Sequence, residues 1–412
     1  MWLFRIILPN NQFHIEKLLA LKTIVITLCL AIGLWSCESA AKKSEKTQQD
    51  TVIAAAPKPS LSPEEYKRYH DMVSDFVEKN LSPRYFNGGI LVAKNGVPVY
   101  ERYTGFSNLR TKDSMTAETP MQVASTGKTL TAAAILKLVQ EGRMDLDDPL
   151  EKFFPNFPYQ GVTVKMLLNH RSGLPNYLYY FEQNKWKRNV PATNQDVLNT
   201  LYQWRPPLTS LTGKHYHYCN TNYVVLASLI EKVSGVTYPQ YMKDNFFTPL
   251  GMTNSFVKTQ ADSATVVYSY KANGGIWMPD FSDGPYGDKN IYSTCRDLLK
   301  WDQALYDGRI IRQDLLDSAF KPYSFEKPGV KNYGLGWHLL MLPNNKKVVY
   351  HNGKWHGFTS AFARLTDERV TIIMTSNKYN MGVYAMSKKM YNLFGPYDGR
   401  NDNSNDDEGG SK

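Results

Sequence analysis

The chain has 412 residues and a formal net charge of +10. Hydrophobic residues make up 42% of it, charged residues 21% and aromatic residues 13%, a globular composition that excludes a disordered, collagen-like or disulfide-stapled chain. The length allows two or three domains, or one large domain with insertions. The basic charge favours anionic partners, but no basic stripe is interleaved with aromatic residues, so we predict no nucleic-acid partner.

The first 36 residues carry the features of an export signal. An apolar run from Thr23 to Trp35 follows two lysines and is too short to span a bilayer. It ends in Leu-Trp-Ser-Cys, which resembles a bacterial lipobox. We therefore expect residues 1–36 to be a lipoprotein signal peptide, and Cys37 to carry a lipid anchor at the periplasmic face of a membrane or at the cell surface. An uncleaved signal anchor is the alternative.

The rest of the chain divides into a tether, a folded body and a tail. Residues 37–60 are rich in Ala, Lys, Ser, Gln and Pro and cannot bury enough apolar area to offset their ordering entropy, so we expect a disordered tether. The folded domain is expected over 61–395, followed by an acidic disordered tail over 396–412. An oxidising compartment would permit a disulfide between Cys219 and Cys295. The sequence leaves their pairing open and favours two unpaired thiols.

The beginning of the body predicts a helix and a hairpin. Ser62-Pro63-Glu64-Glu65 is a capping box with proline at the first helical position, which predicts a helix to about Lys79. Asn95-Gly96 predicts a hairpin between strands at 89–93 and 97–103. Pro98 places the second of these strands at a sheet edge, or points its missing N–H donor outward.

The C-terminal part predicts further strands and a closing helix. The expected strands are 333–341, 346–350, 358–365 and 370–375, and the expected helix is 383–394. Strands at both ends of the body, with a helical and loop-rich stretch over about 125–325, imply one antiparallel sheet with an inserted helical region. This is an α+β fold, an α/β sandwich, with a cleft where the two parts meet.

Ser125 and Lys128 are the candidate nucleophile and base. They precede an expected helix over 129–141 that is apolar on nearly every face and ends at Gly142, so this helix should be buried. Residues three apart share a helix face. Burial at a helix N-terminus should lower the pKa of Lys128 from about 10.4, and the N–H groups there suit a developing oxyanion.

Two later motifs place polar groups near the expected cleft. Tyr218-Cys219-Asn220 precedes a helix that stops at Gly235, so it can direct a phenol and an amide between helices and sheet. His351-Asn352-Gly353 is expected to end a strand, where glycine lets a substrate backbone approach closely.

Other chemistries are poorly supported. His215 and His217 alternate with no further ligand at a recognised spacing, so we predict no metal and no cofactor. No Gly-x-Ser-x-Gly occurs, which argues against the nucleophile elbow of an α/β-hydrolase.

Together these motifs resemble those of class C β-lactamases, penicillin-binding proteins, D-Ala-D-Ala carboxypeptidases and related serine esterases. The resemblance covers about 60–395 and implies a β-lactamase/transpeptidase-like fold. The segments that carry it are Ser125-Thr126-Gly127-Lys128, Tyr218-Cys219-Asn220, His351-Asn352-Gly353, 167–175, 292–298 and 333–337.

The resemblance also implies roles for individual residues. Ser125 would be acylated, Lys128 and Tyr218 would carry its proton, and Asn220 would orient Lys128 and the substrate amide. The oxyanion hole would consist of the N–H groups of Ser125 and Lys354.

The third motif departs from class C β-lactamases, which have Lys-Thr-Gly at that place. A histidine there is similar to certain D-Ala-D-Ala carboxypeptidases, D-aminopeptidases and esterases. His351 would support Tyr218 and bind substrate together with Gly353. Since histidine titrates near pH 6.5, a cationic ring could hold a substrate carboxylate only at lower pH. Trp355 is expected to narrow the acyl pocket.

We therefore expect an exported serine hydrolase that acts through an acyl-enzyme on D-amino-acid-containing wall peptides, in the manner of a D,D-carboxypeptidase, or on small esters. Its expected partners are that substrate, peptidoglycan, and the membrane through the lipid anchor. The alternatives are a non-catalytic sensor that binds peptidoglycan or β-lactams, and a true β-lactamase.

Overall fold

The computed structural model describes residues 60–82, 86–264 and 266–398. The expected signal peptide, Cys37 and nearly all of the tether lie outside these residues, as does most of the acidic tail. Within the described ranges no helix is both long enough and apolar enough to cross a membrane.

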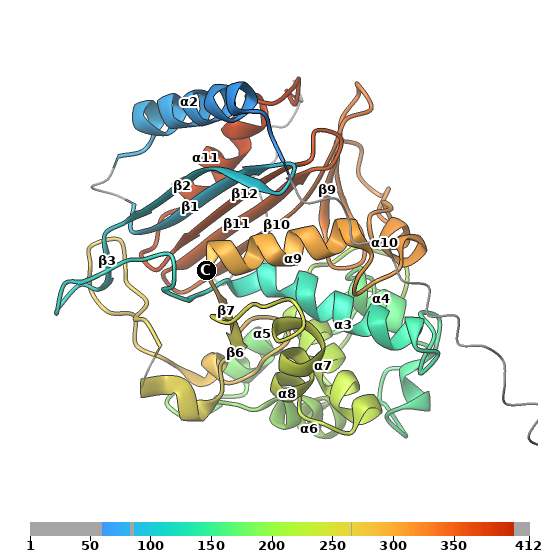
Figure 1. The fold of residues 1–412 in the computed structure, drawn as a ribbon. Helices are drawn as coiled ribbons and strands as arrows, with labels where there is room; N and C mark the ends of the chain where they lie inside the picture. Colours follow the sequence, from blue (N-terminus) through green and yellow to red (C-terminus); the bar gives the residue numbers. More distant parts are fainter. Residues whose placement is uncertain (1–59, 83–85, 265, 399–412) are drawn as a thin grey trace, which may run out of the picture. The chain divides into compact units, whose positions relative to one another are not determined.

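An antiparallel sheet of seven strands forms the centre of the fold (Figure 1). It is assembled from both ends of the body, as the sequence predicts, because β1 pairs with β12. In spatial order the strands are β2 (Val97–Thr104), β1 (Gly88–Lys94), β12 (Val370–Ser376), β11 (Phe358–Leu365), β10 (Lys347–Trp355), β9 (His338–Met341) and β8 (Lys331–Tyr333).

The first helix and hairpin form as predicted. In α2 (Pro63–Asn80) the Ser62 Oγ accepts the Glu65 N–H, and the Glu65 carboxylate accepts the Ser62 N–H, which completes the capping box. Asn95 and Gly96 both have positive φ, 52° and 80°, as the tight turn of a two-residue hairpin requires. Strand β2 lies at the sheet edge, and Pro98 pairs with Ala93 where the register of β1 and β2 shifts; edges and bulges are the places in a sheet that tolerate a proline.

Helices cover both faces of the sheet. Figure 1 shows α2 and α11 (Gly382–Tyr391) on one side and α9 (Cys295–Asp307) on the other. Alternate residues of β1 face opposite sides, so Ile90 and Val92 pack in one core cluster and Leu91 in the other. Because both faces are buried, β1 is apolar without interruption from Ile90 to Ala93 instead of alternating.

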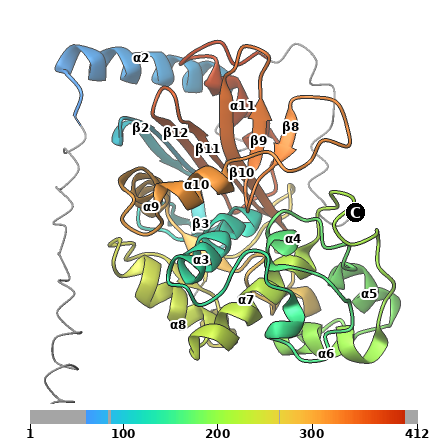
Figure 2. The same cartoon turned by 90° about the vertical axis from the view of Figure 1, so that its right-hand side faces the viewer.

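The inserted region is built around α7 (Asn220–Ser234), which is buried on nearly every side and ends at Gly235 with φ 81°. Figure 2 shows the helices of the inserted region below the sheet. The helices that contact α7 are α3 (Lys128–Gln140), α4 (Val164–Leu168), α5 (Tyr177–Gln183), α6 (Asn194–Trp204) and α8 (Tyr238–Met242). Further short elements include β3 (Phe106–Asn108), β4 (Asp113–Ser114) and α10 (Gln313–Ala319).

Three features differ from the sequence predictions. The strand expected over 333–341 is two strands, β8 and β9, separated by a turn at Gly336, which has φ 86°. Strand β10 runs on to Trp355 and does not end at Gly353. A small sheet also forms beside the insert, because β5 (Met121–Gln122), just before the insert, pairs with β7 (Ile291–Ser293), and β7 pairs with β6 (Phe256–Val257). Strands of two or three residues are too short for hydrophobic periodicity to reveal.

Both described cysteines are unpaired and buried, as the sequence favours. The Cys219 thiol donates to the Leu174 carbonyl at 3.3 Å, and Cys295 lies 3.4 Å from the Thr375 hydroxyl. Burial raises the pKa of Cys219 to about 11 and that of Cys295 to about 12. Both therefore stay protonated at neutral pH and are poor nucleophiles.

Candidate active site

Ser125 and Lys128 meet at the start of α3. Ser125 lies in a short 3-10 turn, η1 (Ala124–Gly127), and Lys128 is the first residue of α3. The Lys128 Nζ donates to the Ser125 Oγ at 3.0 Å. Lys128 is fully buried, while Ser125 is partly exposed. Ala124 has φ 47°, a strained conformation of the kind that concentrates at functional sites. The hydroxyl is thus presented to solvent with an amine behind it.

A second contact fixes the Lys128 amine. Its Nζ also donates to the Asp288 carbonyl at 2.7 Å and lies 5.1 Å from the centre of the Tyr218 ring and 5.6 Å from that of Tyr223. Two hydrogen bonds and two aromatic faces hold the amine in one position. An amine held this way can accept the Ser125 proton when neutral and return it when charged.

Asp288, whose carbonyl holds Lys128, also forms a buried ion pair with Lys289. Lys289 and Asp288 are 2% and 1% exposed, and the Lys289 Nζ lies 3.1 Å from the Asp288 Oδ2. Lys289 also donates to the Tyr177 hydroxyl, which donates to Asp288 at 3.1 Å. The Lys289 Nζ lies 4.4 Å from the centre of the Trp355 ring. Sequence reasoning missed this network, because two adjacent opposite charges usually form a solvated surface pair.

Tyr218 and Asn220 lie at the start of α7. Tyr218 is half-buried beside Lys128, and its ring centre is 4.2 Å from that of His170. His170 fixes the loop, because its Nδ1 accepts the Cys219 N–H at 3.1 Å. Asn220 is the first residue of α7 and is buried. The fold therefore brings Tyr218 to the predicted pair, and Asn220 sits on the same loop-to-helix junction.

His351 is buried and neutral. The Asn352 carbonyl can only accept, so the His351 Nδ1 donates to it, at 2.6 Å. The Nε2 then accepts from the Tyr333 hydroxyl at 3.2 Å. Burial, with the charges of His338 and Lys128, holds the pKa of His351 well below its ordinary value. The expectation of titration near pH 6.5 is therefore wrong for this ring, and it does not supply a cation for a substrate carboxylate near neutral pH.

Gly353 brings β10 against the nucleophile. A Cβ on Gly353 would lie 2.3 Å from the Val123 carbonyl oxygen and 2.9 Å from the Ser125 nitrogen. The glycine is thus required for packing of the protein's own backbone, and the prediction that it admits a substrate backbone is wrong. Close packing here sets the position of the Ser125 N–H.

In the part of the chain that the structure describes, the outer edge of β10 has no strand partner after Tyr350. Strand β9 pairs with β10 only as far as Tyr350. Trp355 and Phe358 pair across a two-residue turn, so the alternation of an antiparallel ladder turns the Lys354 N–H away from β11 and toward this open edge. The Ser125 and Lys354 N–H groups can together bind an oxyanion. The site therefore offers a nucleophile, a base and two donors to an acyl group.

Comparison with known proteins agrees with this geometry. A family model described as Beta-lactamase matches residues 74–394, which is most of the chain. The chain belongs to the beta-lactamase family. It is a serine hydrolase of the superfamily that contains beta-lactamases and penicillin-binding proteins, with the corresponding mixed α+β fold.

The relatives of this beta-lactamase-family chain include a penicillin-binding protein and two proteins named for D-amino acids. Penicillin-binding protein 4* of Bacillus subtilis is 33% identical over 335 residues, 76% of this chain and 74% of that protein. A D-aminopeptidase of Brucella anthropi is 28% identical and covers 74% of this chain, which spans 58% of it. The structure of a D-amino acid amidase from Ochrobactrum anthropi has a TM-score of 0.65 at 25% identity, covering 78% of this chain and 98% of that one.

The histidines considered as metal ligands have other surroundings. His215 and His217 are exposed, and the His217 Nδ1 lies 3.5 Å from a threonine hydroxyl. In the described part of the chain, one trio of potential ligands lies close together: Asp280, Asp283 and His356. Asp283 accepts from the His356 Nε2 at 3.0 Å and from the Trp355 Nε1 at 2.9 Å. Its oxygens therefore hold the β10–β11 turn in place.

Proposed function

We propose that this chain is an exported serine hydrolase that forms an acyl-enzyme on Ser125 and cleaves D-amino-acid-containing wall peptides. The observation that carries the catalytic part is the 3.0 Å contact between the buried Lys128 amine and the partly exposed Ser125 hydroxyl. Ser125 attacks the substrate carbonyl while Lys128, with Tyr218, takes its proton. The leaving amine takes that proton and departs, and water then attacks the acyl-enzyme by the reverse route.

The open edge of β10 supports a peptide substrate. An extended peptide can pair with an unpaired strand edge through main-chain hydrogen bonds, and this edge runs past the Lys354 N–H. The D-configuration is supported by the names of the relatives, a D-aminopeptidase and a D-amino acid amidase. A small ester needs the same acyl chemistry without the edge pairing and is the second candidate substrate.

Efficient β-lactam hydrolysis is less well supported. The neutral His351 stands where class C β-lactamases have a lysine, so the ring does not supply a cation there near neutral pH. A non-catalytic sensor is disfavoured because a bound substrate carbonyl would lie between a nucleophile and two N–H donors.

A substrate panel tests the proposal. We expect the wild-type protein to release D-alanine from a D-Ala-D-Ala peptide and to cleave p-nitrophenyl esters, with little turnover of nitrocefin. The Ser125→Ala variant should lose both activities. A stable adduct on Ser125 with no turnover of any substrate would favour a sensor, and turnover in the variant would refute the acyl-enzyme.

Export and lipid attachment at Cys37 complete the proposal. They are supported by the apolar run and the lipobox-like ending of residues 1–37. Metabolic labelling with an alkyne fatty acid should mark the full-length chain but not a Cys37→Ala variant. Equal labelling of both would contradict attachment at this residue.

A further inference from the structure

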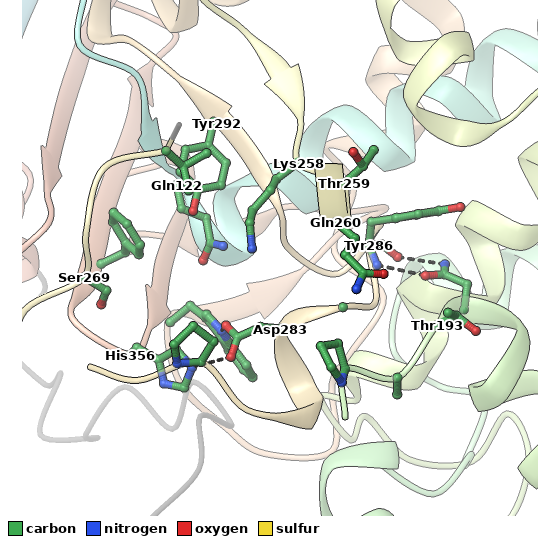
Figure 3. A pocket seen from close by; sticks show the side chains of 18 of the residues that line it. Gln122, Thr193, Lys258, Thr259, Gln260, Ser269, Asp283, Tyr286, Tyr292 and His356 are labelled. Atoms are coloured by element: carbon green, nitrogen blue, oxygen red, sulfur yellow. Dashed lines mark hydrogen bonds and ion pairs between the residues drawn. The ribbon is translucent and has the colours of Figure 1, made fainter. Parts of the chain in front are cut away.

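A pocket of about 760 Å³ lies outside the catalytic residues described above (Figure 3). Its walls come from the small sheet, the β10–β11 turn, the start of α6 and residues 266–279. The nucleophile and its base do not line it. It nevertheless adjoins them along the chain, because Gln122 precedes Ser125 by three residues and Trp355 directly follows Lys354.

One face of the small sheet forms part of the pocket wall. In the register Gln122 pairs with Tyr292, and Tyr292 pairs with Phe256, so these three side chains share a face. Lys258 lies two residues after Phe256 and points to the same face. Asn290 joins Gln122 and Lys258: its backbone carbonyl accepts the Lys258 N–H, and its side-chain Oδ1 accepts from the Gln122 Nε2, both at 2.8 Å. Figure 3 shows Gln122 and Lys258 side by side, directed into the pocket.

Two buried polar groups that line the pocket, one on the small sheet and one on α7, have no hydrogen-bond partner among the described residues. Gln122 is 2% exposed, and its Oε1 has no hydrogen-bond partner among the described residues. Ser228, 7% exposed, also lines the pocket, and its Oγ likewise has none within the described ranges. Leaving such groups unsatisfied is costly. An N–H group of a ligand would satisfy the Gln122 oxygen.

Lys258 supplies a positive charge at the same wall. Its side chain is half-buried and forms no ion pair with the described residues. Two acids also line the pocket, but both are engaged. Asp283 holds Trp355 and His356, and the Glu231 Oε1 accepts the Tyr238 N–H and the Tyr286 hydroxyl at 2.8 and 2.7 Å. The ammonium is therefore available to a carboxylate.

Aromatic rings complete the pocket. Those that line it include Tyr268, Trp277, Tyr286, Tyr292, Trp355 and Phe358. Such rings pack against the flat faces of amide groups and against aliphatic chains. The combined chemistry of cation, amide oxygen and rings fits a peptide-like group that bears a carboxylate.

We propose that this pocket binds the carboxylate-bearing acyl part of the substrate, with its carboxylate on Lys258 and an N–H on Gln122. This inference rests on the proposed acyl-enzyme function. The acyl part is the better occupant than the leaving group, because it stays on the enzyme through both chemical steps whereas the leaving group must depart after the first.

Two matched esters test the assignment. The p-nitrophenyl esters of N-glutaryl-D-alanine and N-pentanoyl-D-alanine have acyl chains of equal length, and only the first carries a carboxylate. The Lys258→Gln variant should lose about three- to tenfold in kcat/KM on the glutaryl ester, as expected for a half-buried ion pair, and less than about twofold on the pentanoyl ester. Lys258→Arg should restore most of the loss.

The control is Lys79→Gln, which removes one charge from the exposed end of α2 and should change neither ester. A loss that is equal on both esters, or absent on both, in Lys258→Gln would overturn the pocket assignment while leaving Ser125-dependent hydrolysis intact. Hydrolysis that persists in Ser125→Ala would instead overturn the proposed function. The two failures are therefore distinguishable.

Discussion

Removing the Asp288 carboxylate should destabilise the protein and displace Lys128. In Asp288→Asn the Lys289 ammonium, 2% exposed, loses its counterion, and breaking such a buried pair costs about 3–5 kcal/mol. For the roughly 335 described residues the entropy of unfolding is about 0.7 kcal/mol/K. The midpoint of thermal unfolding should therefore fall by about 4–7 °C. Activity should also fall, because the carbonyl that holds the Lys128 amine at 2.7 Å belongs to the same residue.

A double-mutant cycle isolates the charge pair. Lys289→Met alone should also destabilise, whereas Asp288→Asn combined with Lys289→Met removes both charges and should recover most of the lost stability. Circular dichroism gives the unfolding midpoint, and ester hydrolysis gives kcat. If Asp288→Asn unfolds at the wild-type temperature, or if the two losses simply add, the reasoning about this network is wrong.

Three further predictions concern the strand beside the nucleophile. Gly353→Ala should cost about 1–3 kcal/mol of stability by overpacking and most of kcat, since its Cβ would meet the Val123 carbonyl oxygen at 2.3 Å; wild-type kinetics would contradict this. Trp355→Ala should raise kcat/KM for longer p-nitrophenyl acyl chains, and an unchanged chain-length profile would count against a narrowing role. Burial holds the pKa of His351 well below 6.5, so below about pH 6.5 the unfolded chain binds a proton that the folded one does not. For this ring, the free energy of unfolding should therefore fall by about 1.4 kcal/mol for each pH unit from about pH 6.5 toward about pH 5. Urea unfolding of His351→Gln measures the effect, and a free energy of unfolding that depends on pH as steeply as in the wild type would refute the assignment.

The central pair was predictable because its spacing is local. Ser125 and Lys128 are three residues apart in an apolar helical context, so a shared face follows from helix geometry alone. The hairpin at Asn95-Gly96 and the capped helix after Ser62 were predictable for the same reason, since each depends on a few adjacent residues.

The surroundings of the pair were not predictable from one sequence. Asp288 reaches Lys128 across 160 positions of the chain, and no periodicity encodes such a contact. The burial of His351 depends on Tyr333, His338 and Lys128 converging on it, so its neutral state could not be derived from its residue type. The pocket wall is built by three strands of two or three residues, which sequence patterns do not reveal.

Acylation of Ser125 is the most direct test of the account. Intact-mass spectrometry of protein quenched during turnover of a p-nitrophenyl ester should show one added acyl group that peptide mapping places on Ser125. The adduct should be absent from Ser125→Ala and should form far more slowly in Lys128→Met, which keeps the length of the side chain without its amine. An adduct on another residue, or equal rates of acylation with and without the Lys128 amine, would contradict the account.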